Sequence, residues 1–292
     1  MGKRLRHSRE KVHAVRRIRA IVGVAALVML FAAGCNANEG QNAGPDQARG
    51  DTGSGSARDL PQGAVPVDLD PKDFTTRIDN PYWPMDPGLR WTYREIDEEG
   101  VELKVVVTVS DKTKKIANGV TARVVRDTVT EDGELIEDTF DWYAQDKQGN
   151  IWYLGENTAE FENGKLMTRE GSFEAGVDGA QPGIIMPGDP RDGMRYRQEY
   201  YKGEAEDNGE VLSTDEMVQS PFGQFDNALL TKDTNAIEPN VLEYKLYARG
   251  VGPVLTLGVS GGPVGHEDLI NLDTASQKET EEAGTVPLGS AR

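Results

Sequence analysis

In the middle of the chain, hydrophobic side chains recur at every second position, which is the period of a β-strand and not of a helix. Residues 89–96, 101–109 and 120–129 show this best, with many aromatic and β-branched side chains. Shorter runs of the same kind follow at 141–145, 151–154, 194–201, 211–218, 241–248, 251–259 and 268–272. The pattern predicts strands over most of this region. A short helix is expected at 224–230, and a Gly/Pro-rich loop at 176–193.

Turn-forming dipeptides separate these runs. Pairs of Asn or Asp with Gly tolerate the positive φ angles that tight hairpins need. Five such pairs are Asn118-Gly119, Asp132-Gly133, Gly149-Asn150, Asn163-Gly164 and Asn208-Gly209. Hairpin turns join antiparallel neighbours, whereas parallel strands need long crossovers. The sequence therefore predicts an all-β, mainly antiparallel fold, with a single domain formed by a curved meander sheet or an open barrel.

Composition divides the chain into four parts. Residues 1–34 have the regions of a signal peptide. Residues 35–66 are rich in Gly, Ala, Ser, Asn and Asp, so we expect a flexible tether. Residues 67–272 carry the strand pattern, and about 205 residues suffice for one domain with a substantial core. Residues 273–292 are similar to the tether in composition, and we expect a disordered tail.

The N-terminal segment ends at the only cysteine of the chain. Eight Lys and Arg side chains fall in residues 1–19, and residues 20–33 form an uncharged apolar run too short to span a bilayer comfortably. The run ends in LFAAGC, which resembles the lipobox of bacterial lipoproteins, with Ala32 in place of the usual Leu. The resemblance implies that Cys35 is acylated and anchors the protein to the cell membrane, on the extracytoplasmic face. Arg16-Arg17 leave twin-arginine export open beside the general route.

Charge excludes one large class of partners. Loss of residues 1–34 removes eight bases and one acid and moves the net charge from −17 to −24. A domain this anionic repels nucleic acid and anionic lipid headgroups. We therefore expect membrane attachment through the lipid anchor, no nucleic-acid partner, and a ligand or protein partner that the sequence does not specify.

Histidine and cysteine are too scarce for several kinds of site. After residue 34 the chain keeps one histidine, His266, and one cysteine, Cys35. A zinc site built from several His and Cys ligands is therefore excluded. His266 follows a Gly-rich loop, and the chain has no G-x-S-x-G elbow, so we interpret His266 as an ordinary residue that begins a late strand. Nucleotide-binding motifs are absent as well. The sequence predicts no cofactor, no metal and no catalytic residue.

Two acidic patterns leave alternatives open. Asp141 and Glu156 flank an aromatic hairpin and form the first pair to consider for hydrolysis by two carboxylates. Otherwise they are solvated strand residues. The approximate spacing of a calcium loop occurs in Glu204, Glu206, Asn208, Gly209 and Asp215. Because Glu and Asp are interchanged relative to that motif and no flanking helices are evident, we interpret this segment as a hairpin turn at 207–209 on an acidic surface.

The segment 141–156 (DWYAQDKQGNIWYLGE) concentrates aromatic side chains. In a hairpin, Trp142 faces away from Tyr143, and Trp152 faces away from Tyr153, because neighbouring side chains point to opposite faces. One face must pack into the core, and the other is a candidate platform for a ligand. The candidate ligand-facing residues are therefore Trp142, Tyr143, Trp152 and Tyr153.

Together with the sequence YARGVG at 247–252, this segment resembles a family of bacterial exported lipoproteins of uncharacterised function. The resemblance extends over about residues 80–259 and implies a β-rich domain, but it assigns no catalytic residue. We interpret Gly250 and Gly252 as permitting a bend between two strands.

These features favour a membrane-anchored extracytoplasmic lipoprotein that serves as a non-catalytic binding or structural module of the cell envelope. Two alternatives stay open: a carrier of apolar ligands in a half-barrel cavity, and a secreted hydrolase that uses two carboxylates. A large apolar cavity would favour the carrier. Two facing acids in a cleft would favour the hydrolase.

Overall fold

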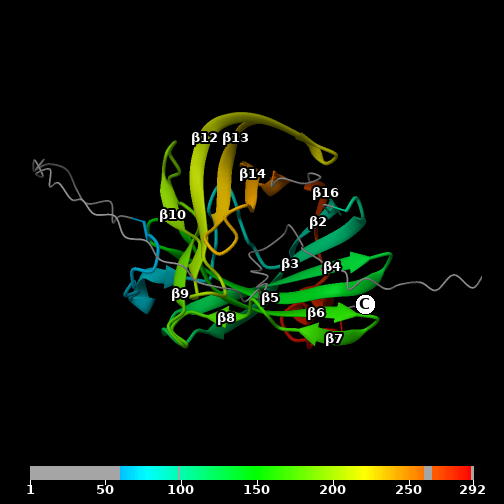
Figure 1. Ribbon diagram of the computed structural model, residues 1–292, viewed down its shortest axis with the longest axis horizontal. Helices are drawn as coiled ribbons and strands as arrows, with labels where there is room; N and C mark the ends of the chain where they lie inside the picture. The colour runs from blue at the N-terminus through cyan, green and yellow to red at the C-terminus, as the bar shows by residue number, and fades with distance from the viewer. Residues whose placement is uncertain (1–59, 98, 260–264, 291–292) are drawn as a thin grey trace, which may run out of the picture.

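The computed structural model describes residues 60–97, 99–259 and 265–290. The predicted signal peptide, Cys35 and most of the predicted tether lie outside the described residues. Sixteen strands form one antiparallel sheet, which curves into a nearly closed barrel (Figure 1). This confirms the all-β fold class and its open-barrel form.

The first half of the barrel is a meander in which each strand pairs with the next one along the chain. Four of the five predicted dipeptides lie at turns of this meander, and Asp132 and Gly133 have φ angles of 51° and 84°. The turn residues thus supply the left-handed backbone that a two-residue hairpin requires. The strands are β2 (Leu89–Ile96), β3 (Glu102–Lys115), β4 (Thr121–Glu131), β5 (Glu134–Asp146), β6 (Ile151–Glu162) and β7 (Lys165–Thr168).

The second half returns to the start of the sheet, because the last strand pairs with β2. Its strands are β9 (Gln181–Met186), β10 (Arg195–Arg197), β11 (Glu199–Tyr200), β12 (Asp207–Ser220), β13 (Gly223–Asn235), β14 (Leu242–Ala248), β15 (Gly252–Gly258) and β16 (His266–Thr274). Short pieces at the margin are η1 (Pro71–Asp73), β1 (Phe74–Thr75) and β8 (Phe173–Glu174). The two ends of the strand order are β10 and β11, which follow one another in the chain and border the seam of the barrel.

Three local predictions are wrong. The expected helix at 224–230 is part of β13, where Leu229 and Leu230 pair with Tyr247 and Leu246 of β14, so sheet pairing overrides the local preference. The expected loop at 176–193 contains β9. The expected turn at Asn208-Gly209 lies inside β12. A Cβ on Gly209 would stand 2.5 Å from the ring of Tyr196, so this glycine makes room for an aromatic ring.

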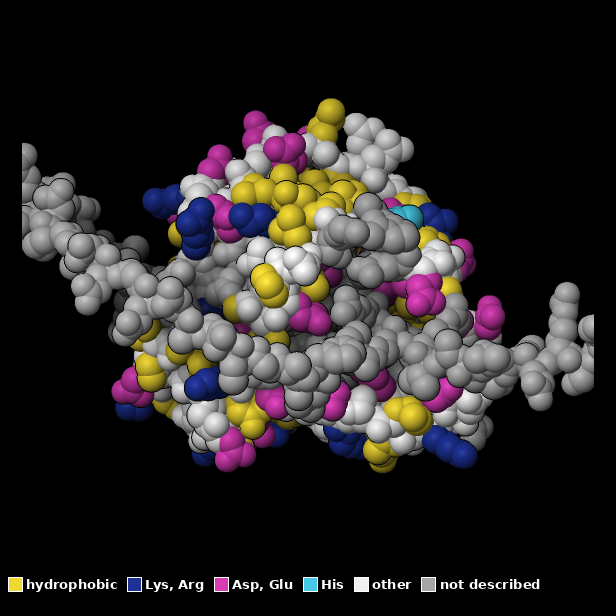
Figure 2. All heavy atoms as spheres, viewed as in Figure 1, with side chains coloured by type: hydrophobic (Ala, Val, Ile, Leu, Met, Phe, Trp, Pro, Cys, Tyr) yellow, Lys and Arg dark blue, Asp and Glu magenta, His cyan; other side chains and the backbone are white. Residues whose placement is uncertain are grey.

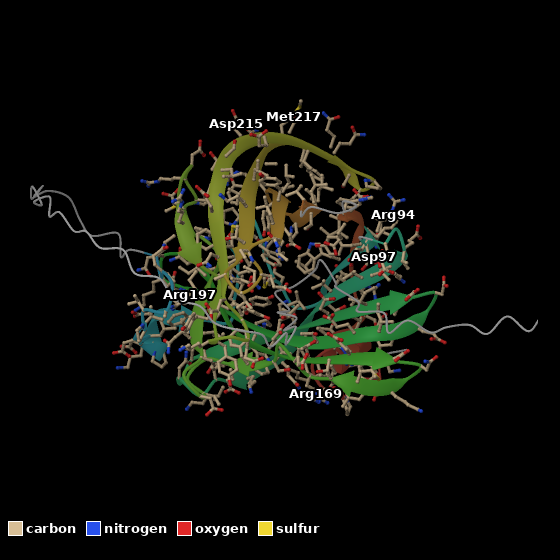
Figure 3. All side chains as sticks on the ribbon, in the orientation of Figure 1. Arg94, Asp97, Arg169, Arg197, Asp215 and Met217 are labelled. Atoms are coloured by element: carbon tan, nitrogen blue, oxygen red, sulfur yellow. The ribbon has the colours of Figure 1, made fainter. Side chains whose placement is uncertain are left out.

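Arg197 fixes the chain at the seam. Its guanidinium donates hydrogen bonds to the carbonyl oxygens of Gly63, Val65 and Pro182 at 2.6, 2.8 and 2.7 Å. Its backbone N–H donates to the carbonyl of Pro61 at 2.7 Å. Arg197 is 1% exposed, and Figure 3 shows its place near β9 and β10. The end of the predicted tether, residues 60–65, is therefore held against the barrel through its backbone, which residue composition does not reveal.

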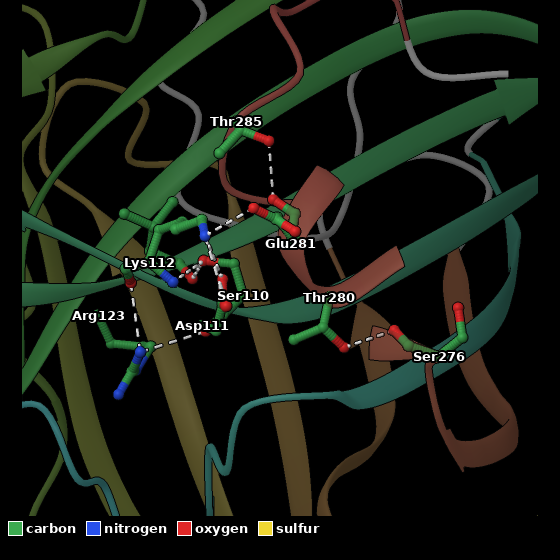
Figure 4. Close-up of polar contacts among 9 residues, drawn as sticks. Ser110, Asp111, Lys112, Arg123, Ser276, Thr280, Glu281 and Thr285 are labelled. Carbon is green, nitrogen blue, oxygen red and sulfur yellow. Dashed lines mark hydrogen bonds and ion pairs between the residues drawn. The ribbon is translucent and has the colours of Figure 1, made fainter. Parts of the chain in front are cut away.

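The C-terminal segment is folded, which corrects the prediction of a disordered tail over 273–292. Its first residues complete β16, and helix α1 (Gln277–Glu282) follows with a capping box between Ser276 and Glu279. Figure 4 shows α1 beside β3, where the Lys112 ammonium lies 3.3 Å from the carboxylate of Glu281.

Beyond the helix, the same segment covers a buried ion pair. The guanidinium of Arg126 donates to the carboxylate of Asp138 at 2.8 and 2.6 Å and to the carbonyl of Val286 at 2.9 Å. The backbone N–H of Gly289 donates to Asp138 at 2.8 Å. The polar composition of the segment conceals this role, because the carbonyls and amides that bind belong to the backbone.

The outer surface carries hydrophobic side chains as well as charges. On the face drawn in Figure 2, hydrophobic side chains gather where Figure 1 draws β12, β13 and β14. Met217 of β12 is 70% exposed and stands at the top of the view in Figure 3. Among the described residues, the only α-helix is α1, and no helix is long and apolar enough to cross a membrane.

We expect removal of residues 276–292 to lower the free energy of unfolding by at least about 2 kcal/mol, because Arg126 and Asp138 would lose buried hydrogen bonds. For a domain of this size the melting temperature should fall by about 5 °C. Thermal unfolding followed by circular dichroism measures the shift. Removal of residues 291–292 alone is the matched control, and equal melting temperatures for the two truncated proteins would contradict the prediction.

Candidate functional site

The inner face of the barrel places aromatic and charged side chains around one cavity. Strand alternation turns Trp91 and Tyr93 of β2 inward, and pairing aligns Trp91 with Val107 of β3 and Val107 with Asp127 of β4. On the other side, Lys245 of β14 pairs with Thr256, and Thr256 with Glu267 of β16. The side chains at these inward positions line a cavity with a volume of about 60 Å³. By that measure it holds about four waters or one compact head group.

Five aromatic rings form one part of the cavity wall: Trp83, Trp91, Tyr93, Tyr143 and Tyr247. The ring of Trp83 lies 6.0 Å from that of Tyr143 and 5.8 Å from that of Tyr247, tilted by 47° and 52°. The indole N–H of Trp91 donates to the carbonyl of Val251 at 2.7 Å, so its polar edge is already satisfied. The wall is therefore mainly aromatic and apolar.

The YARGVG segment shapes this wall. It forms the turn between β14 and β15, with Gly250 and Gly252 at φ angles of 74° and 109°, which confirms the predicted bend. A Cβ on Gly252 would stand 3.1 Å from the indole nitrogen of Trp91 and 3.2 Å from a ring carbon of Trp83. Glycine at this position thus allows both indoles to approach the turn.

Three carboxyl groups supply the negative charges of the cavity lining. Asp127, Asp141 and Glu267 line the cavity and are 6%, 5% and 2% exposed. Oδ1 of Asp127 and Oε2 of Glu267 have no hydrogen-bond partner among the described residues. Burial is the main cause that raises the pKa of each group, to about 7 for Asp141 and well above its usual range for the other two. Buried oxygens of this kind need a hydrogen-bond partner, which a ligand or a water molecule in the cavity would supply.

Further acids lie buried around this lining. Burial raises the pKa of Glu137 to about 8, with neighbouring acids adding to the effect. It also raises the pKa of Glu156, Glu199, Asp207 and Glu243. The barrel interior therefore holds many carboxyl groups whose neutral form is favoured.

Lys245 is a cation in the cavity wall, and it is already paired. Its ammonium lies 2.9 Å from the carboxylate of Asp233 and 3.3 Å from that of Glu243. Burial lowers its pKa, but the attraction of Asp233 and Glu243 outweighs burial and leaves the pKa raised. Lys245 thus forms its ion pairs with Asp233 on β13 and Glu243 on β14, while its charge also acts to lower the pKa of Glu267 in the cavity lining.

Asp141 and Glu156 share the hydroxyl of Tyr153. Each has a carboxyl oxygen 2.8 Å from that hydroxyl. A phenol has one proton to donate, so it bonds both oxygens only if one carboxyl group is protonated and donates in turn. The pair therefore holds a proton, in agreement with the raised pKa of both groups.

The four predicted ligand-facing aromatic residues are all buried and do not form one row. Tyr143 and Tyr153 stack with ring centres 5.1 Å apart, and Tyr143 lines the cavity. Trp142 lies under the Lys114 ammonium, which is 3.9 Å from the ring centre. The indole N–H of Trp152 donates to Asp146 at 2.8 Å. The predicted alternation of faces is thus present, and contact of these residues with a ligand stays a prediction.

Two other predicted sites are now located. His266 begins β16, as expected. The calcium-like spacing is not a hairpin turn: Asn208, Gly209 and Asp215 follow one another along β12, which rises about 3.3 Å per residue. Asp215 therefore stands far from Glu204 and Glu206, near the top of the view in Figure 3. Within the described ranges, no group of His, Cys, Asp and Glu is arranged to hold a metal ion.

Sequence reasoning missed most of the cavity. Trp91 and Tyr93 lie in a predicted strand and Tyr247 in the YARGVG segment, but the sequence does not predict that they line a site. Trp83, Asp127, Lys245 and Glu267 are not among the predicted site residues. One signal was present: β14 reads LEYKLYA, in which charged residues alternate with apolar ones. The two-residue period predicts a strand, but it does not say whether the charged or the apolar side chains of that strand face the barrel interior.

No protein-family model matches the chain, and no curated protein matches it significantly. Two solved structures are similar to it in part. One, described as an exported protein with a YmcC-like fold from Bacteroides fragilis, has a TM-score of 0.37 and 16% identity over 66% of this chain and 99% of that chain. The other, described as a lipoprotein from Parabacteroides distasonis, has a TM-score of 0.35 and 13% identity over 66% and 98%. Likeness at this level assigns no location, ligand or activity to this chain.

We expect the stability of the protein to fall as the pH rises. An acid whose pKa is raised on folding binds more protons in the native state than in the unfolded state, so the free energy of unfolding decreases with pH. For Glu137 the decrease covers the window from its usual value of 4.5 to about 8. Glu137→Gln should flatten the decrease by about 1.4 kcal/mol per pH unit in this window.

Denaturant unfolding between about pH 6 and about pH 8.5 measures this slope. Glu134→Gln, at the exposed start of the same strand, is the matched control and should keep the slope of the unmodified protein. A slope that Glu137→Gln leaves unchanged, or a stability that rises with pH, would show that the native state does not hold this proton.

Proposed function

We propose that the protein is a lipid-anchored extracytoplasmic binding module that takes a small ligand into the cavity of its barrel. The observation that carries this proposal is the lining of the cavity, where aromatic faces stand opposite buried carboxyl oxygens without hydrogen-bond partners. Cavities that combine apolar walls with a few polar groups are typical of ligand sites.

The proposed location rests on the sequence. A basic segment, an apolar run and the lipobox-like ending at Cys35 support export and acylation. In the structure, Arg197 holds residues 63 and 65, at the end of the predicted tether, against the seam.

A polar ligand fits this cavity better than an apolar one. Transfer of an apolar molecule into the cavity would leave Asp127 and Glu267 buried without partners, which costs free energy. The lining therefore weighs against a carrier of purely apolar ligands. The hydrolase alternative requires a substrate between two carboxyl groups, but the hydroxyl of Tyr153 already occupies the space between Asp141 and Glu156.

Cys35→Ala should abolish lipid attachment, because no other residue of the chain lies at a lipobox-like ending. Cells that express the full chain are grown with labelled fatty acid, and the protein is then isolated and its label measured. The unmodified chain should carry label and sediment with membranes, whereas Cys35→Ala should do neither. Label on Cys35→Ala would place the lipid elsewhere and contradict the proposed anchor.

Val107→Phe should block ligand binding, because Val107 lines the cavity and a larger side chain would fill it. Val106→Phe, the next residue on the same strand and on its opposite face, is the matched control. The full chains, purified from membranes in mild detergent, are melted with and without a low-molecular-weight extract of the host cell. A ligand at tenfold excess over its Kd stabilises by about 1.4 kcal/mol, which corresponds to about 3 °C.

The unmodified chain and Val106→Phe should show this stabilisation, and Val107→Phe should not. Equal stabilisation of both variants would place the ligand outside the cavity. No stabilisation of the unmodified chain would contradict the proposed binding function.

A further inference from the structure

The charges that face the cavity are unbalanced. Three acids and one lysine line it, and the lysine is held by Asp233 and Glu243. Asp127 and Glu267 each keep a carboxyl oxygen without a hydrogen bond among the described residues. Lys245 attracts Glu267 and so acts to lower its pKa, but burial and the neighbouring acids outweigh this attraction. When these carboxyl groups are ionised they only accept hydrogen bonds, so a ligand that completes their bonds must donate protons or carry positive charge.

The aromatic wall selects between these two kinds of ligand. Ring faces carry negative electrostatic potential and attract cations, with Trp and Tyr the most effective. The ring centre of Trp83 lies 6.0 Å from that of Tyr143 and 5.8 Å from that of Tyr247, and all three rings line the cavity. Such an arrangement gives few hydrogen bonds, which favours a cation over a neutral hydrogen-bond donor.

Size limits the ligand further. A cavity of about 60 Å³ admits one compact head group and not an extended chain. The net charge of −24 after loss of residues 1–34 draws cations to the protein and repels anions.

Resting on the proposed function, we infer that the cavity binds a compact organic ammonium ion, held by the carboxyl groups of Asp127 and Glu267 and by the surrounding aromatic faces. Asp127 lies on β4 and Glu267 on β16, and both line the same cavity as the indoles of Trp83 and Trp91. The ligand therefore replaces the missing counter-ion of the interior.

Binding of the cation is linked to release of protons. The groups that face Asp127 are Tyr93 and Glu95 on β2, Glu137, Asp141 and Tyr143 on β5, Lys245 on β14 and Glu267 on β16. Their mutual repulsion, added to burial, favours protonated carboxyl groups in the empty cavity. A cation favours the ionised form, so its affinity should increase with pH by up to about tenfold per pH unit for each proton released.

The test compares a cation with a neutral molecule of the same shape. Choline and tetramethylammonium are titrated into the full chain in detergent at about pH 8.5, beside 3,3-dimethyl-1-butanol, in which carbon replaces the charged nitrogen of choline. Calorimetry gives the affinity, and tryptophan fluorescence reports the cavity, because Trp83 and Trp91 line it. The cations should bind about tenfold or more tightly than the neutral alcohol.

Two variants remove the proposed counter-charges without changing shape. Asp127→Asn and Glu267→Gln should each weaken choline about tenfold and leave the alcohol unchanged. Asp226→Asn, on the exposed part of β13, is the matched control and should change neither. Between about pH 6 and about pH 8.5, choline affinity should rise for the unmodified chain and rise less for Asp127→Asn.

Each other outcome overturns this inference in a distinct way. If the alcohol binds as tightly as choline and Val107→Phe abolishes both, the cavity is a binding site but its ligand need not be charged. Tighter binding of acetate than of choline would assign the site to an anion at Lys245. Absence of binding by both cations overturns the inference, and stabilisation by the host extract then decides separately whether the proposed binding function stands.

Discussion

The barrel must accommodate carboxyl groups in an interior that water hardly reaches. Burial of ionised carboxylates is costly, and this chain limits the cost in two ways. Some groups stay protonated, as the single phenolic proton between Asp141 and Glu156 requires. Asp233 and Glu243 pair with Lys245. The pKa values of Asp127 and Glu267 are also raised, but each keeps an oxygen without a hydrogen-bond partner among the described residues, and both side chains line the cavity.

Strands and turns were predictable because they depend on local chemistry. β2 has the bounds expected from its alternating aromatic residues, and Asp132-Gly133 forms the expected turn. The segments that failed depend on distant contacts. Residues 224–230 become a strand through pairing with β14, and Gly209 is required by the ring of Tyr196 and not by a turn.

The candidate site was hidden because charged and aromatic side chains share the inner face. In β14, Lys245 and Tyr247 line the cavity, and Leu246 on the opposite face is buried as well. The usual rule places apolar residues inside and charges outside, so it does not expect Lys245 in the cavity. In β5, Asp141 lines the cavity beside Tyr143. A sequence can thus indicate a strand correctly and still conceal the chemistry of its inner face.

The position of Arg197 has a mechanical consequence for a chain that is held at its N-terminal side. Arg197 grips the backbone at Gly63 and Val65, and it lies in β10, one of the two short strands that border the seam. A pull on the residues before Gly63 would therefore reach the barrel at β10, which pairs with β12 over only three residues. The strands from β2 to β6 lie away from this point of load in the strand order.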